Sequence, residues 1–226
     1  TTFIHSRRIV YYEGNLTDSA FHYFNLGVDL WVRDYLKRQG YELMNADQLK
    51  IFMSSKLDGV SHTVVVFADN KIPKAVVNEE SENTLIRKYL DAGGKVVFLT
   101  TVNPLFITTD PKTGALLGNT NIELASKIFG IKFSTQDFGN GFYYSPYTEQ
   151  GKKWGLVGYT EGYWPVDPIQ VTTVLARDEY GKAVCWVKNY GGPQGSGLMT
   201  LSFIPTNVLG SDFFPMRAAI EYGINW

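Results

Sequence analysis

The sequence contains a single cysteine, Cys185, so the chain cannot close a disulfide within itself. This cysteine lies in the apolar run 183–187, where a small buried side chain is the usual interpretation. An excess of either charge is also missing, because 21 Lys and Arg residues stand against 22 Asp and Glu residues. A protein that follows a phosphate backbone carries a basic patch, so nucleic acid is not a predicted partner.

Long hydrophobic runs are absent as well. A membrane helix needs roughly 20 consecutive apolar residues, and the densest apolar stretches of this chain are soon broken by Lys, Asp or Gly. No membrane insertion is therefore predicted. The 44% hydrophobic content of the 226 residues is enough for a sizeable core, and we expect one domain over residues 1–226.

Metal and nucleotide motifs are lacking too. The histidines His5, His22 and His62 show no paired ligand spacing. The dinucleotide pattern G-x-G-x-x-G does not follow the first predicted strand, and the glycines around Lys152 and Lys153 do not have the spacing of a phosphate-binding loop. We therefore predict no metal and no cofactor.

The chain begins at Thr1 without a methionine, as a processed protein or a fragment of a longer one would. A removed signal peptide and missing neighbouring domains are both left open by this start. The sequon at Asn15 matches N-glycosylation in a eukaryotic secretory context. These observations do not decide the cellular compartment of the protein, and an extracytoplasmic location is favoured.

What the sequence does contain is an alternation of strand and helix patterns. Strands are predicted at 8–12, 41–44, 63–67, 96–99 and 131–133, and helices at 28–40, 46–56, 85–90 and 121–129. Within the second helix, Leu49, Phe52 and Met53 share one face. Strands that are apolar throughout are typical of a parallel sheet covered on both faces. The predicted fold class is α/β, with a doubly wound, flavodoxin-like, mostly parallel sheet flanked by helices.

The texture changes in the second half of the chain. Residues 134–170 are rich in glycine, aromatic and polar residues without a regular period, which predicts long loops. Strands at 171–177, 183–190 and 198–204 then form a β-meander. A closing helix is predicted at 212–222, after an N-cap at Ser211 and Asp212, with Phe213, Met216 and Ile220 on its apolar face.

The order of these elements, with "YLDAGGKVVFL", "VLARDEYGKAVCWVKNY", "GLMTLSFIP" and the closing "FFPMRAAIEYGINW", resembles the class I glutamine amidotransferase-like fold. The resemblance is to its non-amidotransferase branches, such as ThuA-like proteins and the trimerisation domain of some β-galactosidases. Glutamine-hydrolysing members carry a G-x-C-x-G elbow and a late His-x-Glu pair. This chain has Leu99-Thr100-Thr101 at the elbow position and no late histidine, so the resemblance implies no glutamine hydrolysis.

Ligands of open α/β sheets bind beyond the carboxyl ends of the strands. The sequence places seven candidates there: Glu13, Asn15, Asp69, Asn70, Thr100, Thr101 and Asn103. Two of them, Glu13 and Asp69, are carboxylates suited to general acid and base work, and the other five are candidate ligand-binding residues. Asp and Asn residues after strands are common turn formers and helix caps, and this structural role is favoured over catalysis. A threonine nucleophile is not favoured, because no His or Lys lies near Thr100 or Thr101 in the sequence except Lys95, at the far end of the strand.

Aromatic residues gather in the predicted loops. They are Phe142, Tyr143, Tyr144, Tyr147, Trp154, Tyr159, Tyr163 and Trp164, with Asn140, Glu149, Glu161 and Asp167 beside them. Aromatic rings with convergent polar groups suit a sugar or a protein surface, which makes Glu161 a third candidate acid and Trp164 a candidate ligand contact. Anchoring of the loops to the core is the favoured alternative.

These residues and patterns are compatible with two classes of function. The preferred one is a non-catalytic binding or assembly domain, as a module of a carbohydrate-related or envelope protein, whose partner is a carbohydrate, another protein or a second copy of the chain. The alternative is a hydrolase or isomerase acting on a sugar or related polar metabolite, with Glu13, Asp69 or Glu161 as acid and base.

Overall fold

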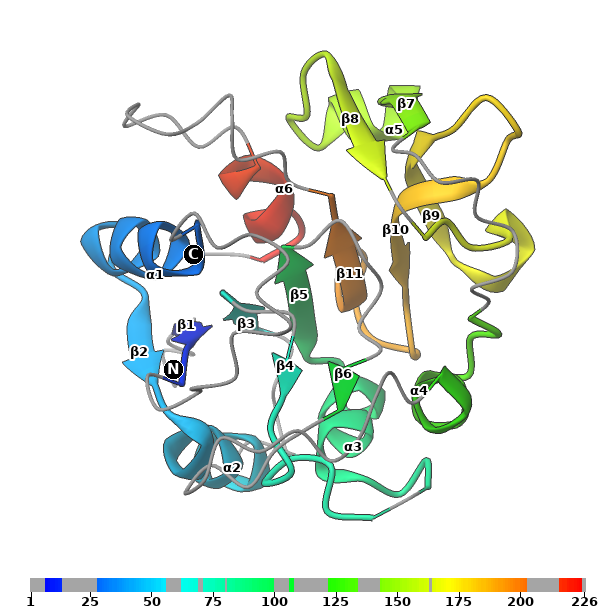
Figure 1. Cartoon of the computed structure of the whole chain (residues 1–226). Coiled ribbons are helices and arrows are strands. Elements are labelled where there is room, and N and C mark those ends of the chain that lie inside the picture. The colour runs from blue at the N-terminus through cyan, green and yellow to red at the C-terminus, as the bar shows by residue number, and fades with distance from the viewer. Residues whose placement is uncertain are drawn as a thin grey trace.

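The protein is built around a seven-stranded sheet in the order β2-β1-β3-β5-β11-β10-β9 (Figure 1). The computed structural model describes residues 7–13, 28–55, 62–68, 71–79, 81–99, 106–107, 122–133, 143–162, 164–202 and 216–224. The strands are β1 (Arg7–Tyr11), β2 (Glu42–Met44), β3 (Thr63–Phe67), β5 (Lys95–Leu99), β9 (Thr173–Arg177), β10 (Ala183–Lys188) and β11 (Gly197–Leu201). The first five strands of that order are parallel, and β10 is antiparallel to both of its neighbours.

This topology confirms the predicted fold class. With β5 and β11 counted as the fourth and fifth parallel strands, the order is the 2-1-3-4-5 of flavodoxin-like sheets. The predicted meander is also confirmed, because β9, β10 and β11 pair with one another in sequence order. A separate two-stranded parallel sheet, which the sequence patterns did not predict, joins β4 (Lys71–Ile72) to β6 (Phe106–Ile107).

Helices cover both faces of the sheet (Figure 1). Helices α2 (Ala46–Ser55), α3 (Leu85–Asp91) and α4 (Ile122–Phe129) pack on one face, and α1 (Val28–Arg38) and α6 (Arg217–Glu221) pack on the other. Every residue of β3 and β5 is buried, as expected for strands inside a covered parallel sheet. The predicted apolar face of α2 is confirmed, since Leu49, Phe52 and Met53 are all buried.

One row of side chains crosses the sheet on the face covered by α2, α3 and α4. The strand registers place Tyr11, Phe67, Phe98, Thr200 and Trp186 side by side. The ring centroids of Tyr11 and Phe67 are 5.0 Å apart, and those of Phe67 and Phe98 are 4.6 Å apart. The row becomes polar at Thr200, whose hydroxyl is buried without a hydrogen-bond partner, as is the indole nitrogen of Trp186.

Two expectations about the middle of the chain differ from the structure. The strand predicted at 131–133 is wrong, although Ile131 and Phe133 are buried. The backbone N–H of Phe133 donates to the Ser126 hydroxyl instead of a neighbouring strand, and that of Lys132 donates to the side chain of Gln170. The apolar residues at 131–133 therefore indicate burial and do not indicate pairing in the sheet.

Part of the segment predicted as long loops has regular structure. It contains β7 (Tyr143–Pro146), α5 (Glu149–Lys153), β8 (Tyr159–Gly162) and the 3-10 helix η3 (Pro168–Gln170). Strands β7 and β8 pair antiparallel. These strands are only four residues long, so their period-2 pattern is hard to detect among glycines and aromatics.

No helix among the described residues is long and apolar enough to span a membrane. The longest of them, α1, has 11 residues, whereas a spanning helix needs roughly 20.

The closing helix α6 is held by the buried Lys95 and by the partly buried Glu221. The ammonium of Lys95, at the start of β5, donates to the carbonyls of Ala219 (3.2 Å) and Tyr222 (3.1 Å). The carboxylate of Glu221 accepts from Tyr41 (2.9 Å) and Arg217 (3.0 Å). The two hydrogen bonds of Lys95 fasten the end of α6 to the start of β5.

Glycines permit close backbone contacts at the amino end of β11. Gly197 has a φ of 110°, and a Cβ atom there would overlap the carbonyl of Lys188. Gly181, in the turn between β9 and β10, also has a positive φ of 77°, but its Cβ direction is open.

We expect Gly197→Ala to lower the free energy of unfolding more than Gly181→Ala. Left-handed backbone strain alone should cost Gly181→Ala about 1–2 kcal/mol, whereas Gly197→Ala should cost about 3 kcal/mol or more because the backbone must also shift. Urea denaturation of the two variants measures the difference. Equal costs would show that the close approach at Gly197 does not constrain the fold.

The buried Lys95 predicts a pH dependence of stability. Burial lowers its pKa from 10.5 to about 7, and the Glu221 carboxylate opposes this shift. Between these two values the unfolded chain holds a proton that the folded protein has lost, so the free energy of unfolding rises with pH across this window. Relative to Lys95→Met, the wild-type stability should rise by about 1.4 kcal/mol per pH unit at the steepest point. Urea denaturation from pH 7 to 10 tests this, and a constant difference between the two proteins would contradict it.

Candidate functional site

The carboxyl ends of β1, β2, β3, β5 and β11 meet at one edge of the sheet, where ligands of this architecture bind. Of the seven residues predicted at this edge, the structure describes Glu13. The other six lie outside the described residues: Asn15, Asp69, Asn70, Thr100, Thr101 and Asn103.

Glu13 has a structural task at this edge. Its carboxylate is nearly buried and accepts the backbone N–H of Ala46, at the start of α2, at 3.3 Å. Asn45 and Gln48 complete the helix terminus, since each side chain accepts the backbone N–H of the other. A carboxylate at a helix N-terminus is favourable for both hydrogen bonding and the helix dipole. The geometry agrees with the helix-capping role that was favoured from the sequence.

The most distinctive surface lies on the β7–β8 hairpin, next to β9 and β10 at the top of Figure 1. Its register pairs Tyr144 with Glu161, and Pro146 with Tyr159, on one side of the two strands. Ser145 and Thr160 form the pair between them, which points to the other side and is buried. We call the outward set, Tyr144, Pro146, Tyr159 and Glu161, the tyrosine face.

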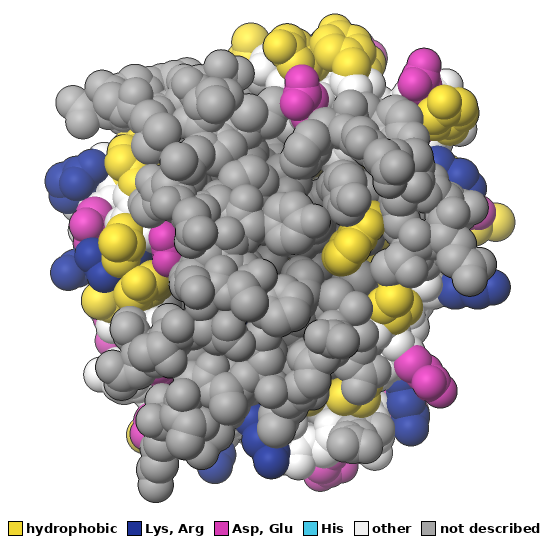
Figure 2. Space-filling view, viewed as in Figure 1, with side chains coloured by type: hydrophobic (Ala, Val, Ile, Leu, Met, Phe, Trp, Pro, Cys, Tyr) yellow, Lys and Arg dark blue, Asp and Glu magenta, His cyan; other side chains and the backbone are white. Residues whose placement is uncertain are grey.

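The two tyrosines of this face are exposed and touch each other. Tyr144 is 61% exposed and Tyr159 is 47% exposed. This exposure is unusual, because large aromatic side chains commonly pack in the core. The ring centroids of the two tyrosines are 4.7 Å apart, with planes inclined at 39°. Figure 2 shows hydrophobic side chains gathered over this part of the molecule, with an acidic side chain beside them. Among the described residues, no Lys or Arg forms an ion pair with Glu161.

The opposite side of the hairpin is fastened to the sheet. The hydroxyl of Thr160 donates to the Ser202 carbonyl, just beyond β11, at 2.8 Å, and the Ser202 hydroxyl donates back to the Glu161 carbonyl. Gly162 packs so closely on Val184 that a Cβ atom would overlap that side chain. The tyrosine face is therefore held in place from behind.

The other described aromatics of this region follow the anchoring alternative. Tyr147 and Trp154 are buried, and the Trp154 ring stacks on Tyr222 with centroids 4.2 Å apart. Trp164, a predicted ligand contact, is half-buried and packs against the core on the face of α2, α3 and α4.

Composition pointed to Glu161 and Trp164 as site residues but did not single out Tyr144 and Tyr159. The available signal was the alternation of an aromatic and a small polar residue in Tyr144-Ser145 and in Tyr159-Thr160, which is typical of a strand with one buried side.

Cys185 is not a reactive thiol in this structure. It is fully buried in β10, and its sulfur accepts the backbone N–H of Ser202 at 3.2 Å. Burial raises the pKa of the Cys185 thiol to about 12. Because the thiolate is the nucleophilic form, this environment suits packing rather than catalysis.

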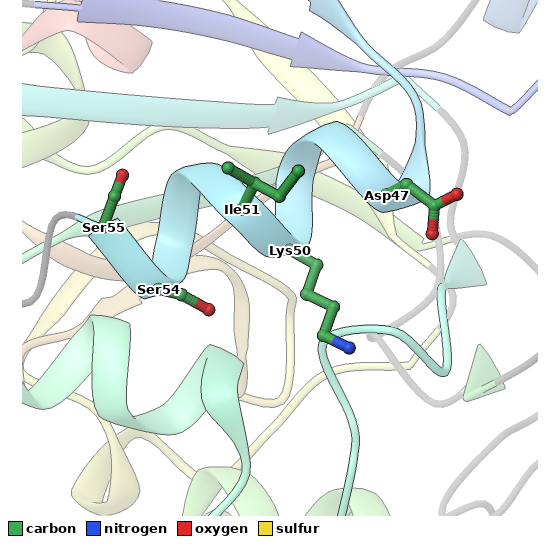
Figure 3. A pocket seen from close by; sticks show the side chains of 5 residues that line it. All are labelled: Asp47, Lys50, Ile51, Ser54 and Ser55. Carbon is green, nitrogen blue, oxygen red and sulfur yellow. The ribbon is translucent and has the colours of Figure 1, made fainter.

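Two open cavities elsewhere contain none of the predicted site residues. The first, of about 570 Å³, is lined by five residues of α2: Asp47, Lys50, Ile51, Ser54 and Ser55 (Figure 3). The second, of about 620 Å³, lies between α5, η3 and β9 and includes Glu149 and Arg177. The part of the chain that the structure describes holds no group of three or more His, Cys, Asp or Glu side chains that could bind a metal ion.

Two buried threonines provide a matched test of the hairpin anchor. Thr160→Val leaves the Ser202 carbonyl without its partner and should cost about 1–3 kcal/mol of unfolding free energy. Thr200→Val removes a buried hydroxyl that has no partner, so it should be neutral or stabilise the protein by up to about 2 kcal/mol. Chemical denaturation of both variants measures the change in unfolding free energy, which should be a loss for Thr160→Val and zero or a gain for Thr200→Val. A stabilised Thr160→Val would remove the proposed anchor, and a strongly destabilised Thr200→Val would reveal a partner for that hydroxyl.

The comparisons with known proteins identify a family. Among curated proteins, none has a significant match to this sequence. The model of the MJECL34 family matches residues 7–213, which include the whole seven-stranded sheet and the β7–β8 hairpin. The chain therefore belongs to the MJECL34 family.

Proposed function

We propose that this protein is a non-catalytic binding or assembly domain that contacts its partner through the tyrosine face. The observation that carries the proposal is the pair of exposed, touching rings of Tyr144 and Tyr159 on a hairpin that is fixed from behind. Aromatic side chains are enriched at recognition surfaces because they offer a large contact area at a small cost in conformational entropy. A rigid support lowers the ordering cost of binding further.

The candidate acids give less support to catalysis. Glu13 is engaged at the N-terminus of α2, and Glu161 lies opposite Tyr144 on the tyrosine face. The proposal of a binding domain therefore ranks above that of an enzyme.

The second candidate is a hydrolase or isomerase acting on a sugar or related polar metabolite. One observation favours it, since the Glu161 carboxylate stands directly opposite Tyr144 on a surface that a ligand can reach. In this function Glu161 would be the acid or base, with Glu13 or Asp69 as its predicted partner.

We further propose that the chain is related to the non-amidotransferase branches of the glutamine amidotransferase-like superfamily, and that it is one domain of a carbohydrate-related or envelope protein. The doubly wound sheet with its antiparallel β10 supports the relationship. A fold alone does not assign a function, so the tyrosine face carries the functional part of the proposal.

The binding function predicts that the tyrosine face mediates a measurable interaction. The double variant Tyr144→Ser/Tyr159→Ser should lose a ligand-induced thermal shift, or a self-association detected by sedimentation, that the wild type shows. A ligand that binds only the folded state raises its apparent stability, by about 2.7 kcal/mol at 100 times Kd. Sugars, nucleotides and amino acids are suitable probes.

Tyr180→Ser is the matched control, because Tyr180 is 69% exposed in the turn between β9 and β10. If the control variant and the double variant behave alike in every assay, the tyrosine face has no binding role. Turnover of aryl glycosides that disappears in Glu161→Gln would instead favour the enzyme.

A further inference from the structure

We propose that the ligand of the tyrosine face is a neutral saccharide, with a sugar ring stacked on Tyr144 and Tyr159 and a sugar hydroxyl donated to Glu161. This assignment rests on the proposed binding function and names the class of ligand. Three properties of the face support it: its size, the geometry of its rings and its charge.

The size of the face favours a small ligand over a protein. Strands β7 and β8 have four paired residues each. A four-residue strand is about 13 Å long and two paired strands are together about 10 Å wide, so the face covers on the order of 130 Å². A stable protein interface buries about 800 Å² on each partner. One or two sugar rings match this area, whereas a protein partner would need much more of the surface.

The arrangement of the rings favours stacking over caging. Aromatic cages hold an ammonium group between rings that stand apart, within about 6 Å of each ring centroid. The centroids of Tyr144 and Tyr159 are only 4.7 Å apart, so the rings fill the space between them. What they offer outward is the exposed part of the two rings, 61% for Tyr144 and 47% for Tyr159. The C–H face of a pyranose can lie on such a surface while the sugar hydroxyls reach polar groups.

The charge of the face selects among ligands that stack. Glu161 is its one charged residue and is paired with Tyr144 across the strands. A carboxylate accepts hydrogen bonds from hydroxyl groups, and two adjacent hydroxyls of a sugar can use both of its oxygens. The same carboxylate repels phosphate, so a nucleotide that stacked its base here would bring its anionic group to an acidic site. A neutral polyhydroxylated ring fits both the rings and the acid.

Isothermal titration calorimetry with soluble neutral oligosaccharides of glucose, galactose, mannose and N-acetylglucosamine tests the inference. At least one should bind with a Kd in about the micromolar to millimolar range. Tyr144→Ala and Tyr159→Ala should each weaken binding about tenfold or more, because stacking on one ring commonly contributes that much. Tyr159→Phe should retain most of the affinity, since it keeps the ring. Glu161→Gln should weaken binding severalfold, and Tyr180→Ala should leave it unchanged.

The controls separate this inference from the binding function itself. Binding of AMP or choline to the tyrosine face, in the absence of any sugar binding, would overturn the saccharide and keep the binding domain. The saccharide would also be overturned, and the binding domain kept, by a second result. In it the wild type binds no sugar at about 10 mM, and Tyr144→Ser/Tyr159→Ser loses a self-association that the wild type shows. If no substitution on the tyrosine face changes the binding of a sugar or of any other probe, both proposals are wrong. Circular dichroism of each variant verifies that the fold is retained.

Discussion

Strands β3 and β5 are buried at every residue, and this double burial determines how the rest of the molecule is arranged. A strand that is apolar on both faces needs a helical layer on each side, so the helices are divided between the two faces of the sheet. The faces are then no longer available for recognition. Functional groups must lie at the carboxyl edge of the sheet or on structure added at its rim.

The hairpin formed by β7 and β8 is such an addition. Its inner side behaves as part of the core, because Ser145 and Thr160 are buried and Gly162 allows close packing on β10. Its outer side carries two exposed tyrosines and one carboxylate. A two-stranded hairpin is only marginally stable alone in water. The hydrogen bonds between Thr160, Ser202 and Glu161 therefore matter for keeping the outer side chains in place.

Two kinds of buried polar group stand out among the described residues. Lys95 and Glu13 are satisfied by the backbone of helix termini, at the end of α6 and at the start of α2 respectively. Such contacts offset the cost of removing a charge from water and fix the position of a helix. Thr200 and Trp186 have buried polar atoms without partners, next to each other in the aromatic row across the sheet. The packing around these two side chains has to offset the free energy lost when their polar atoms leave water.

Residue order was sufficient to predict the alternation of strands and helices, the fully buried strands, the apolar face of α2 and the C-terminal meander. Those features depend on local periodicity, which is strong when a strand or helix buries one or both faces. Long-range packing, in contrast, decided that residues 131–133 are buried without pairing and that β7 and β8 pair as a hairpin. It also decided which aromatics face outward, because composition places eight rings in one stretch and says nothing of which side of a strand meets the core. Burial of Tyr147 and exposure of Tyr144 follow from where the hairpin is attached to β9 and β11, and those contacts join residues far apart in the sequence.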